Sequence, residues 1–397
     1  MAVLRRRGLR PDWRRTKPVS GDPSDAEEKV SASEGVSGAA AAAGGILTIG
    51  VEAVVANWRS LAARVAPART AAVVKADAYG LGAAPLVRPL YDAGCRDFFV
   101  VALSEADLLR PLLPSDASIY VLNGLLPGTA AAYGDGVVPV LNSLTQCRAW
   151  ADATHGRRPS VIQVDTGMSR LGLDVAEQQS LVADPGLVAA TGARHVMSHL
   201  ACADEPDKPA SGEQLAAFRA ARQRLPGLAA SLAASSGIFL GADYHFDLTR
   251  PGASLYGIET SPRAEGIRPV VDLKVRVAQL REIETGTSVG YGYTFRASRT
   301  IRLATLTVGY ADGWWRRFSG GAGAVYFGGI RLPSVGRVSM DSCSVDVSAL
   351  PVGALAEGDL VELIGPHQSV DDVARAAGTI GYEVLTALGR RYHRIYR

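Results

Sequence analysis

A single lysine ends an apolar run that has the length and composition of a buried strand. Residues 71–74 lead into Lys75, and the stretch AVVKADAYGLG (72–82) continues with a tyrosine and two glycines. A lysine held away from water is charged less readily, so its pKa falls and its amine becomes nucleophilic. A neutral lysine amine can form a Schiff base with an aldehyde. The alternative is a lysine that extends from the strand end into solvent.

The composition allows a sizeable apolar core and places much of the basic excess in an N-terminal tail. Apolar residues make up 47% of the 397 residues, and the formal net charge of +3 arises largely from arginines within residues 1–17. Residues 1–45 are small, polar and aperiodic, which predicts a disordered, low-complexity tail. We expect neither nucleic-acid binding nor a membrane span. The scattered cysteines, without a CxxC pair, predict reduced thiols and a cytoplasmic location. They are Cys95, Cys147, Cys202 and Cys343.

Eight apolar segments alternate with helix-compatible segments after the first helical pattern. This alternation predicts an N-terminal (β/α)8 TIM-type barrel over residues 46–270. An open doubly wound sheet is the structural rival, but no GxGxxG turn follows its first strand. The expected strands are 71–75, 97–102, 118–122, 137–141, 160–165, 194–199, 230–234 and about 246–254.

The pattern changes near residue 271. Segments such as VVDLKVRVAQLREI and GAVYFGGIRLPSVGRVSM alternate apolar and polar residues and are separated by glycine turns. Such alternation is typical of half-buried strands. We therefore expect a mainly β C-terminal domain over residues 271–397, which the short strand at 46–50 could also join.

The predicted barrel would gather chemistry at one end. Lys75 would lie at the carboxyl end of the first barrel strand, where barrel enzymes build their active sites. His195, His199 and Cys202 suggest zinc at first sight. However, their segment is predicted to be a strand followed by a loop, and no second cluster completes a tetrahedral site. We expect no metal.

The motif VVKADAYGLG resembles the cofactor-lysine motif of the alanine racemases. Further blocks that resemble successive family motifs follow in order and extend the resemblance from about residue 46 to the end. They are VDTGMSRLG (164–172), SHLACADEPD (198–207), LTRPGASLYG (248–257), GYGYTF (290–295), VGYADG (308–313), GRVSMD (336–341) and YEVLTALGRRYHRIY (382–396). The resemblance implies a pyridoxal 5'-phosphate enzyme that interconverts L-alanine and D-alanine. The resemblance implies one of two roles for such an enzyme: it supplies D-alanine as a peptidoglycan precursor, or it takes part in the catabolism of D-alanine.

The resemblance also implies a role for each matching residue in cofactor binding. Lys75 would carry the cofactor and act as one acid–base group. Arg250 would face the pyridine nitrogen, and because a guanidinium keeps its proton it would not protonate the ring. The residues implied for the phosphate are Tyr79, Ser235, Gly252 and Tyr382. Ser235 and Gly252 also follow the seventh and eighth predicted strands, where barrels commonly bind phosphate.

Racemisation requires proton transfer on both faces of a planar intermediate, so one lysine is not enough. By resemblance, Tyr291 is the second base, supplied by the partner subunit of a head-to-tail homodimer, and His199 links it to Arg250. Arg170 and Met340 would bind the substrate carboxylate. Tyr310 and Asp341 are further partner-subunit candidates near the entrance.

Four positions depart from the family pattern. Gln163 replaces a lysine and can hydrogen-bond Arg170 without adding charge; Ala234, Ser231 and Gly50 replace asparagine, histidine and aspartate, respectively. These departures leave a broad-specificity or serine-type racemase as an alternative. A decarboxylase of similar design would differ in GYGYTF and GRVSMD. A non-enzymatic pyridoxal phosphate carrier would lack the second domain and Tyr291.

Overall fold

The computed structural model describes residues 38–397. It divides the chain into two units, Met1–Ala41 and Ala42–Arg397, and a short helix, α1 (Gly38–Ala42), lies at their boundary. Residues 1–37, most of the predicted tail, lie outside the described residues. The elements that follow α1 all belong to the second unit.

Eight parallel strands form the barrel. The first consists of two pieces, β2 (Arg69–Thr70) and β3 (Ala72–Val73), and β2 pairs in parallel with the last barrel strand, β10 (Leu248–Thr249). The amide of Arg250 donates to the carbonyl of Ala233 (2.9 Å), which joins β10 to β9 and closes the ring. The strands between, in spatial and chain order, are β4 (Asp97–Val100), β5 (Ser118–Val121), β6 (Val137–Leu141), β7 (Ser160–Gln163), β8 (Ala193–Met197) and β9 (Ala229–Ser231). The predicted barrel is confirmed.

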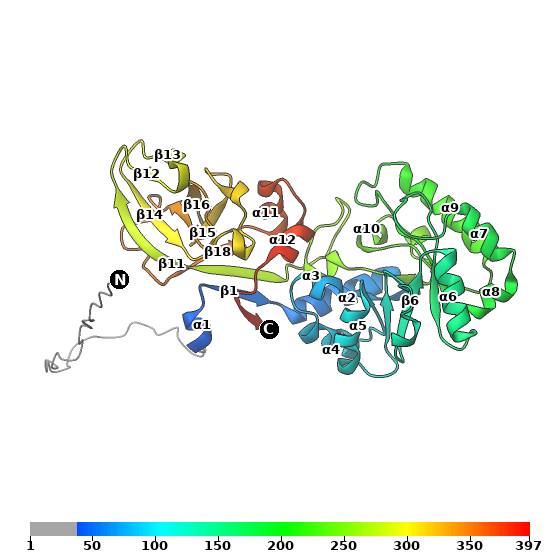
Figure 1. Ribbon diagram of the computed structural model, residues 1–397. Coiled ribbons are helices and arrows are strands. Elements are labelled where there is room, and N and C mark those ends of the chain that lie inside the picture. The colour runs from blue at the N-terminus through cyan, green and yellow to red at the C-terminus, as the bar shows by residue number, and fades with distance from the viewer. Residues whose placement is uncertain (1–37) are drawn as a thin grey trace, which may run out of the picture. The chain divides into compact units, whose positions relative to one another are not determined.

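Helices cover the outside of these strands (Figure 1). In α2 (Val51–Val65), Val54, Trp58, Leu61 and Val65 are buried, and their spacing of three and four residues forms one apolar stripe. The helix ends before Pro67, which follows Ala66 at its C-cap. The other labelled α elements of this domain are α3 (Lys75–Tyr79), most of which is left-handed, α4 (Ala84–Asp92), α5 (Leu103–Leu109), α6 (Leu144–Thr154), α7 (Val175–Val182), α8 (Pro185–Ala190), α9 (Ala210–Arg224) and α10 (Ser235–Ile238).

The C-terminal domain is an eight-stranded, largely antiparallel sheet with the order β14-β17-β16-β15-β18-β11-β1-β19. Its long central strand, β11 (Val271–Ile283), pairs with β1 and β18 along its first half and with β14 along its second half. The remaining elements are β12 (Ser288–Val289), β13 (Phe295–Arg296), β14 (Ile301–Leu306), β15 (Ala324–Phe327), β16 (Ile330–Val335), β17 (Cys343–Asp346), β18 (Leu360–Ile364), α11 (Val370–Ala377) and α12 (Gly381–Ala387).

The first strand of the second unit belongs to this sheet rather than to the barrel. β1 (Gly45–Ile49) lies between β11 and the last strand, β19 (His393–Tyr396), antiparallel to the former and parallel to the latter. The C-terminal strand also reaches the loop after Lys75, because Tyr396 donates its hydroxyl proton to the carbonyl of Leu81 (2.9 Å). The β sheet thus supports a loop of the barrel.

Four findings concern membrane association, metal binding, the cysteines and the two histidines near β8. Within residues 38–397, no helix is both long and apolar enough to cross a membrane, and no cluster of three or more metal-ligating side chains occurs. All four cysteines are free. His195 contacts Arg69 (Nε2···Nη2 3.3 Å), whereas His199 lines the main cavity, so these two histidines do not share a site.

Candidate active site at the carboxyl ends of the barrel strands

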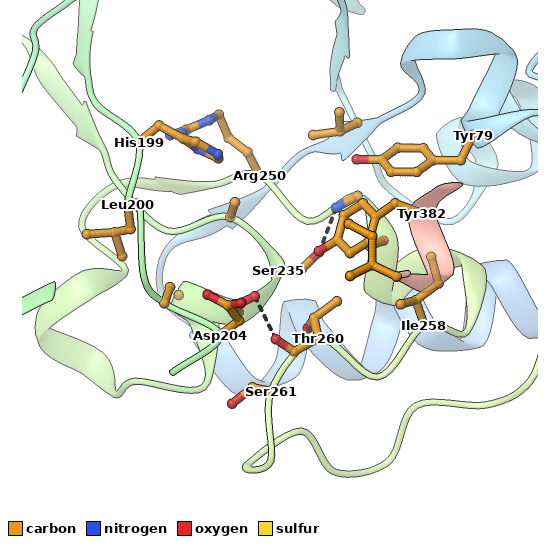
Figure 2. Close-up of a pocket in the computed structure, with 18 of the residues that line it drawn as sticks. Tyr79, His199, Leu200, Asp204, Ser235, Arg250, Ile258, Thr260, Ser261 and Tyr382 are labelled. Atoms are coloured by element: carbon orange, nitrogen blue, oxygen red, sulfur yellow. Dashed lines mark hydrogen bonds between the residues drawn. The ribbon is translucent and has the colours of Figure 1, made fainter. Parts of the chain in front are cut away.

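A cavity of about 980 Å³ opens at the carboxyl ends of the barrel strands. Figure 2 shows part of it, with the side chains of His199 and Arg250 at one side and those of Tyr79, Ser235 and Tyr382 at the other. Eight of the predicted site residues line the cavity: Lys75, Tyr79, Arg170, His199, Ser235, Arg250, Gly252 and Tyr382. Seven of them follow barrel strands that are far apart in sequence, so barrel closure brings these seven together, whereas Tyr382 comes from α12 of the C-terminal domain.

Lys75 lies two residues after the end of β3, and its side chain is half-buried. Burial lowers the pKa of its ammonium, and the positive charges of Arg170 and Arg250 lower it further, while Glu105 acts in the opposite direction. A lowered pKa increases the fraction of neutral amine at a given pH. Lys75 is therefore suited to nucleophilic attack and to proton transfer inside the cavity.

The chain after Lys75 forms one left-handed helical turn. Its four residues have φ between 52° and 57°; they are Ala76, Asp77, Ala78 and Tyr79. A left-handed conformation costs a residue other than glycine about 1–2 kcal/mol, so such residues seldom occur in a row. The amide of Gly80 donates to the carbonyl of Ala76 (2.7 Å), and Asp77 accepts from the amide of Ala83 (2.7 Å). This turn brings Tyr79 into the cavity.

Tyr79, Ser235 and Gly252 form a compact polar corner. Ser235 Oγ accepts hydrogen bonds from the amides of Gly252 (2.9 Å) and Ser254 (3.2 Å), so its own proton is available to a ligand. The backbone of Gly252 lies so near the Tyr79 hydroxyl that an added Cβ would come within 2.3 Å of it. The ring of Tyr382 is 6.0 Å from that of Tyr79, centroid to centroid. Hydroxyl donors that converge in this way suit an anion such as phosphate.

Arg250 is 3% exposed and its guanidinium is fixed by neutral oxygens. Nη1 donates to Ser231 Oγ (2.5 Å) and Nη2 donates to the carbonyl of Ser198 (2.7 Å). The hydroxyl of Ser231, one of the departures from the family pattern, donates a hydrogen bond to the carbonyl of Leu248 (2.5 Å). Burial lowers the pKa of Arg250 to about 10, so the guanidinium keeps its proton at neutral pH.

His199 remains neutral at physiological pH. Burial, followed by the positive charges of Arg250 and Arg170, lowers its pKa to about 3. Its imidazole can therefore donate at one nitrogen and accept at the other, which a relay between a phenol and a guanidinium requires.

The loop that carries Arg170 is held by hydrogen bonds between its backbone and the side chains of Asp165 and Gln163. Asp165 Oδ1 accepts from the amides of Gly167 (2.9 Å) and Met168 (3.0 Å). The buried side chain of Gln163 donates to the carbonyl of Leu171 (3.1 Å), the neighbour of Arg170. Gln163 therefore positions the backbone next to Arg170 instead of bonding its guanidinium.

The other four predicted residues do not line the barrel cavity. Tyr291 begins η5 (Tyr291–Tyr293) and is 70% exposed, Met340 is 53% exposed and Tyr310 is 41% exposed. These three residues and Asp341, the fourth of the group, all lie on the β domain. Tyr291 borders a second, shallower hollow of about 520 Å³. Within one chain, the structure separates these residues from Lys75.

An ion-pair network that the sequence did not indicate supports this β-domain surface. Arg391 contacts both carboxylate oxygens of the buried Asp312 (2.6 and 2.7 Å) and also Asp341 (2.6 Å). The amide of Tyr310 donates to the carbonyl of Ser339 (3.0 Å). The two loops that carry Tyr310, Met340 and Asp341 are thus joined to each other and to the C-terminal segment.

A closed barrel with a half-buried lysine of lowered pKa, a buried arginine and a group of hydroxyls at one end is the arrangement of a barrel enzyme. The family model for the N-terminal domain of alanine racemase matches residues 49–260, and the model for its C-terminal domain matches residues 270–396. Alanine racemase from Brucella ovis is 52% identical over 373 residues, which cover 89% of this chain and 94% of the relative. A catabolic alanine racemase from Mesorhizobium japonicum is 53% identical over 361 residues, 90% and 94% of the two chains.

Solved structures agree with this assignment. The structure of alanine racemase from Bartonella henselae with covalently bound pyridoxal phosphate superposes with a TM-score of 0.86 at 44% identity, covering 89% of this chain and all of the other. Biosynthetic alanine racemase from Pseudomonas aeruginosa gives a TM-score of 0.80 at 36% identity, covering 89% and 99%. The chain belongs to the alanine racemase family, whose members are isomerases.

Proposed function

We propose that this chain is a pyridoxal 5'-phosphate-dependent alanine racemase that works by a two-base mechanism. The observation that carries the proposal is the half-buried Lys75, whose lowered pKa sets a reactive amine in the same cavity as the buried cation Arg250. Membership of the alanine racemase family and 52% identity to a curated member support alanine as the substrate.

The cavity residues fit the cofactor. The corner made by Tyr79, Ser235 and Gly252, with Tyr382 beside it, supplies hydroxyl groups and close backbone approach for the phosphate. When bound, pyridoxal phosphate supplies an aldehyde that condenses with amines and a ring that withdraws electrons from the α-carbon of the substrate. Lys75 would hold the aldehyde carbon and Arg250 would face the ring nitrogen.

Lys75 serves one face of the substrate. Its lowered pKa leaves Nζ able to accept the α-proton and to return a proton at the same position. Arg250 donates a hydrogen bond toward the ring nitrogen but keeps its own proton, because its pKa of about 10 lies well above neutral pH. Arg250 would therefore leave the ring nitrogen unprotonated, which would limit charge stabilisation and disfavour transamination.

A second copy of the chain would serve the opposite face. We propose a head-to-tail homodimer in which Tyr291 of one subunit enters the barrel cavity of the other, next to the neutral His199. The large exposed surface of Tyr291 and Met340 supports this arrangement. Arg170 and the backbone of Met340 would bind the substrate carboxylate, with Tyr310 and Asp341 at the entrance.

Two alternatives are tested with the main proposal. Gln163 and Ala234 favour a broad-specificity or serine-type racemase, because both change the wall of the cavity relative to the family pattern. A non-enzymatic pyridoxal phosphate carrier is disfavoured by the second domain. We also propose a cytoplasmic location and a role in supplying D-alanine for peptidoglycan.

The test is chiral chromatography of the full chain, loaded with pyridoxal phosphate, against a panel of L- and D-amino acids. We expect interconversion of the alanine enantiomers in preference to all others. Faster turnover of serine or of larger amino acids indicates the broad-specificity alternative. A yellow protein that is inactive on every amino acid indicates the carrier.

The proposal that Tyr291 is the second acid–base group is tested separately. Replacing Tyr291 by phenylalanine should impair proton abstraction from L-alanine far more than from D-alanine, because the phenol serves only one face. Single-turnover deuterium exchange into each enantiomer measures this asymmetry. Equal losses for the two enantiomers would refute the assignment of Tyr291.

A further inference from the structure

The left-handed turn after Lys75 needs external support, because it contains no glycine. Its residues 76–79 all adopt positive φ, which each of them disfavours when isolated. The direction in which the lysine side chain leaves the backbone depends on this turn. Any group that holds the turn therefore controls where the amine of Lys75 lies.

Glu105, near the start of α5, is such a group. Its Oε1 accepts a hydrogen bond from the amide of Ala76 (2.6 Å), the first residue of the turn. Its Oε2 accepts from the amides of Val101 (2.7 Å) and Ala102 (3.2 Å), at the end of β4 and the beginning of α5. One carboxylate thus joins the turn after the first barrel strand to the loop after the next.

We propose that Glu105 is a positioning residue for Lys75: its carboxylate holds the left-handed turn against the start of α5 and fixes where the lysine amine enters the cavity. The proposal rests on the proposed function only in taking Lys75 as the reactive amine. The hydrogen bonds that carry it are independent of the substrate.

An amide cannot replace the carboxylate here. Ionised glutamate accepts at both oxygens, whereas glutamine presents an NH₂ group in place of one of them. In Glu105→Gln, that NH₂ group must face either the amide of Ala76 or the amides of Val101 and Ala102. Facing Ala76 loses one hydrogen bond, whereas facing Val101 and Ala102 loses two. The NH₂ group therefore turns toward Ala76 and that side of the bridge is lost, although the side chains have nearly the same size.

The charge of Glu105 adds a second effect. The charged and titratable groups that face Lys75 are Arg170 on the loop after β7, Arg250 after β10, His199 after β8 and Glu105 on α5. His199 is neutral at physiological pH, so Glu105 opposes two arginines. Removing the negative charge should therefore move the pKa of Lys75 further down.

Glu177 provides a matched control. It occupies the same N-terminal position in α7 and also bridges two segments, because its carboxylate accepts from the amides of Leu144 (2.9 Å) and Asp174 (3.4 Å). Glu177 contacts neither the turn nor the loop after β4 in the structure. Glu177→Gln therefore reports the general effect of losing a bridging carboxylate.

The first experiment is amide hydrogen exchange of the full chain, read by peptide mass spectrometry. In Glu105→Gln, exchange in the peptide covering residues 76–82 should accelerate at least about ten-fold, because a hydrogen bond to a charged group is lost. In Glu177→Gln, acceleration should be confined to residues 144–146 and 174–178. Equal acceleration of residues 76–82 in both variants, or none in Glu105→Gln, overturns the proposal.

The second experiment measures Lys75 itself. Competitive acylation of the cofactor-stripped full chain across pH gives the pKa of Lys75 from the labelled peptide. We expect a lower pKa in Glu105→Gln than in the wild type and in Glu177→Gln, and a smaller fall in Glu105→Asp, which keeps the charge. If the two Glu105 variants fall equally, the charge effect is wrong.

These measurements also distinguish a failure of the proposed function from a failure of the positioning role of Glu105. If the wild-type chain fails to racemise alanine while the exchange and labelling results follow expectation, the proposed function fails and the positioning role of Glu105 stands. If racemisation is observed and residues 76–82 keep wild-type exchange in Glu105→Gln, only the positioning role fails. A variant that does not fold is replaced by Glu105→Asp, in which the same peptide should exchange faster than in wild type.

Discussion

Replacing Gly252 by alanine should weaken cofactor binding through a single steric contact. The φ of Gly252 is −129°, so the position does not require the left-handed conformation that favours glycine. The added Cβ would lie 2.3 Å from the Tyr79 hydroxyl, 3.0 Å from its Cζ and 3.2 Å from Val73 Cβ. The tightest of these contacts is with Tyr79, so the steric effect depends mainly on the position of that side chain.

The size of the effect follows from how firmly Tyr79 is held. Its ring packs 4.9 Å from that of Tyr256, centroid to centroid, and its backbone belongs to the left-handed turn. The hydroxyl must move by about 1 Å to reach an ordinary contact distance, and overpacking of this kind costs about 1–3 kcal/mol. If this cost falls on the bound state, the affinity for pyridoxal phosphate drops about 5-fold to 150-fold.

The assay is absorbance titration of the cofactor-stripped full chain with pyridoxal phosphate. Gly134→Ala is the control, since its added Cβ would meet no atom within 4 Å. The double variant Gly252→Ala with Tyr79→Phe removes the closest contact, so the loss should be partly recovered relative to the sum of the single changes. Wild-type affinity in Gly252→Ala, or strict additivity in the double variant, would refute this reasoning.

Two further predictions concern stability. Arg391→Gln leaves the buried Asp312 without its bidentate partner. Because Arg391 itself is half-exposed, we expect a loss of about 1–3 kcal/mol in the free energy of unfolding, against less than about 0.5 kcal/mol when Arg88→Gln removes an exposed ion pair. Equal losses for the two variants in denaturant titration would contradict this prediction. His199 has a folded pKa of about 3, below the 6.5 of an unfolded histidine, so the unfolded chain binds the extra proton and stability falls as pH drops below 6.5. Without cofactor, the wild type should lose about 2–3 kcal/mol more than His199→Gln between pH 6.5 and pH 4.5; parallel pH profiles for the two chains would contradict it.

Periodicity predicted most of the fold. The alternation of apolar strands and helices placed all eight barrel strands, because each strand is a short apolar run and each intervening helix has its own pattern. The segment LTQCRAWADAT, for example, is compatible with a helix and forms α6 (Leu144–Thr154). Long-range pairing was harder to predict: β1 joins β11 and β19, which follow it by more than 200 residues.

The site was predictable to the extent that its residues fall in motifs. Lys75, Arg250 and Ser235 line one cavity, as barrel closure predicts for strand ends. The left-handed turn was not predictable, because Ala-Asp-Ala-Tyr contains no glycine and only Asp77 tolerates that conformation well. Its stability comes from tertiary contacts, notably the hydrogen bond from the amide of Ala76 to Glu105, which no sequence pattern indicates.

The compensating interactions at the departures from the family pattern were also hidden in the sequence. Ser231 supports Arg250 through its hydroxyl, and Gln163 holds the carbonyl of Leu171. Both depend on side-chain directions that only the folded barrel defines. Sequence alone gave the residue types at these positions but not the partners that they bind.

The most direct measurement is borohydride reduction of the full chain loaded with pyridoxal phosphate, followed by peptide mapping. The chain has only five lysines, at positions 17, 29, 75, 208 and 274, so the labelled residue can be identified without ambiguity. We predict one stable pyridoxyl label, on Lys75, and none there in Lys75→Ala. A label on Lys208 or Lys274 in its place, or no covalent label on the wild-type chain, would contradict the account.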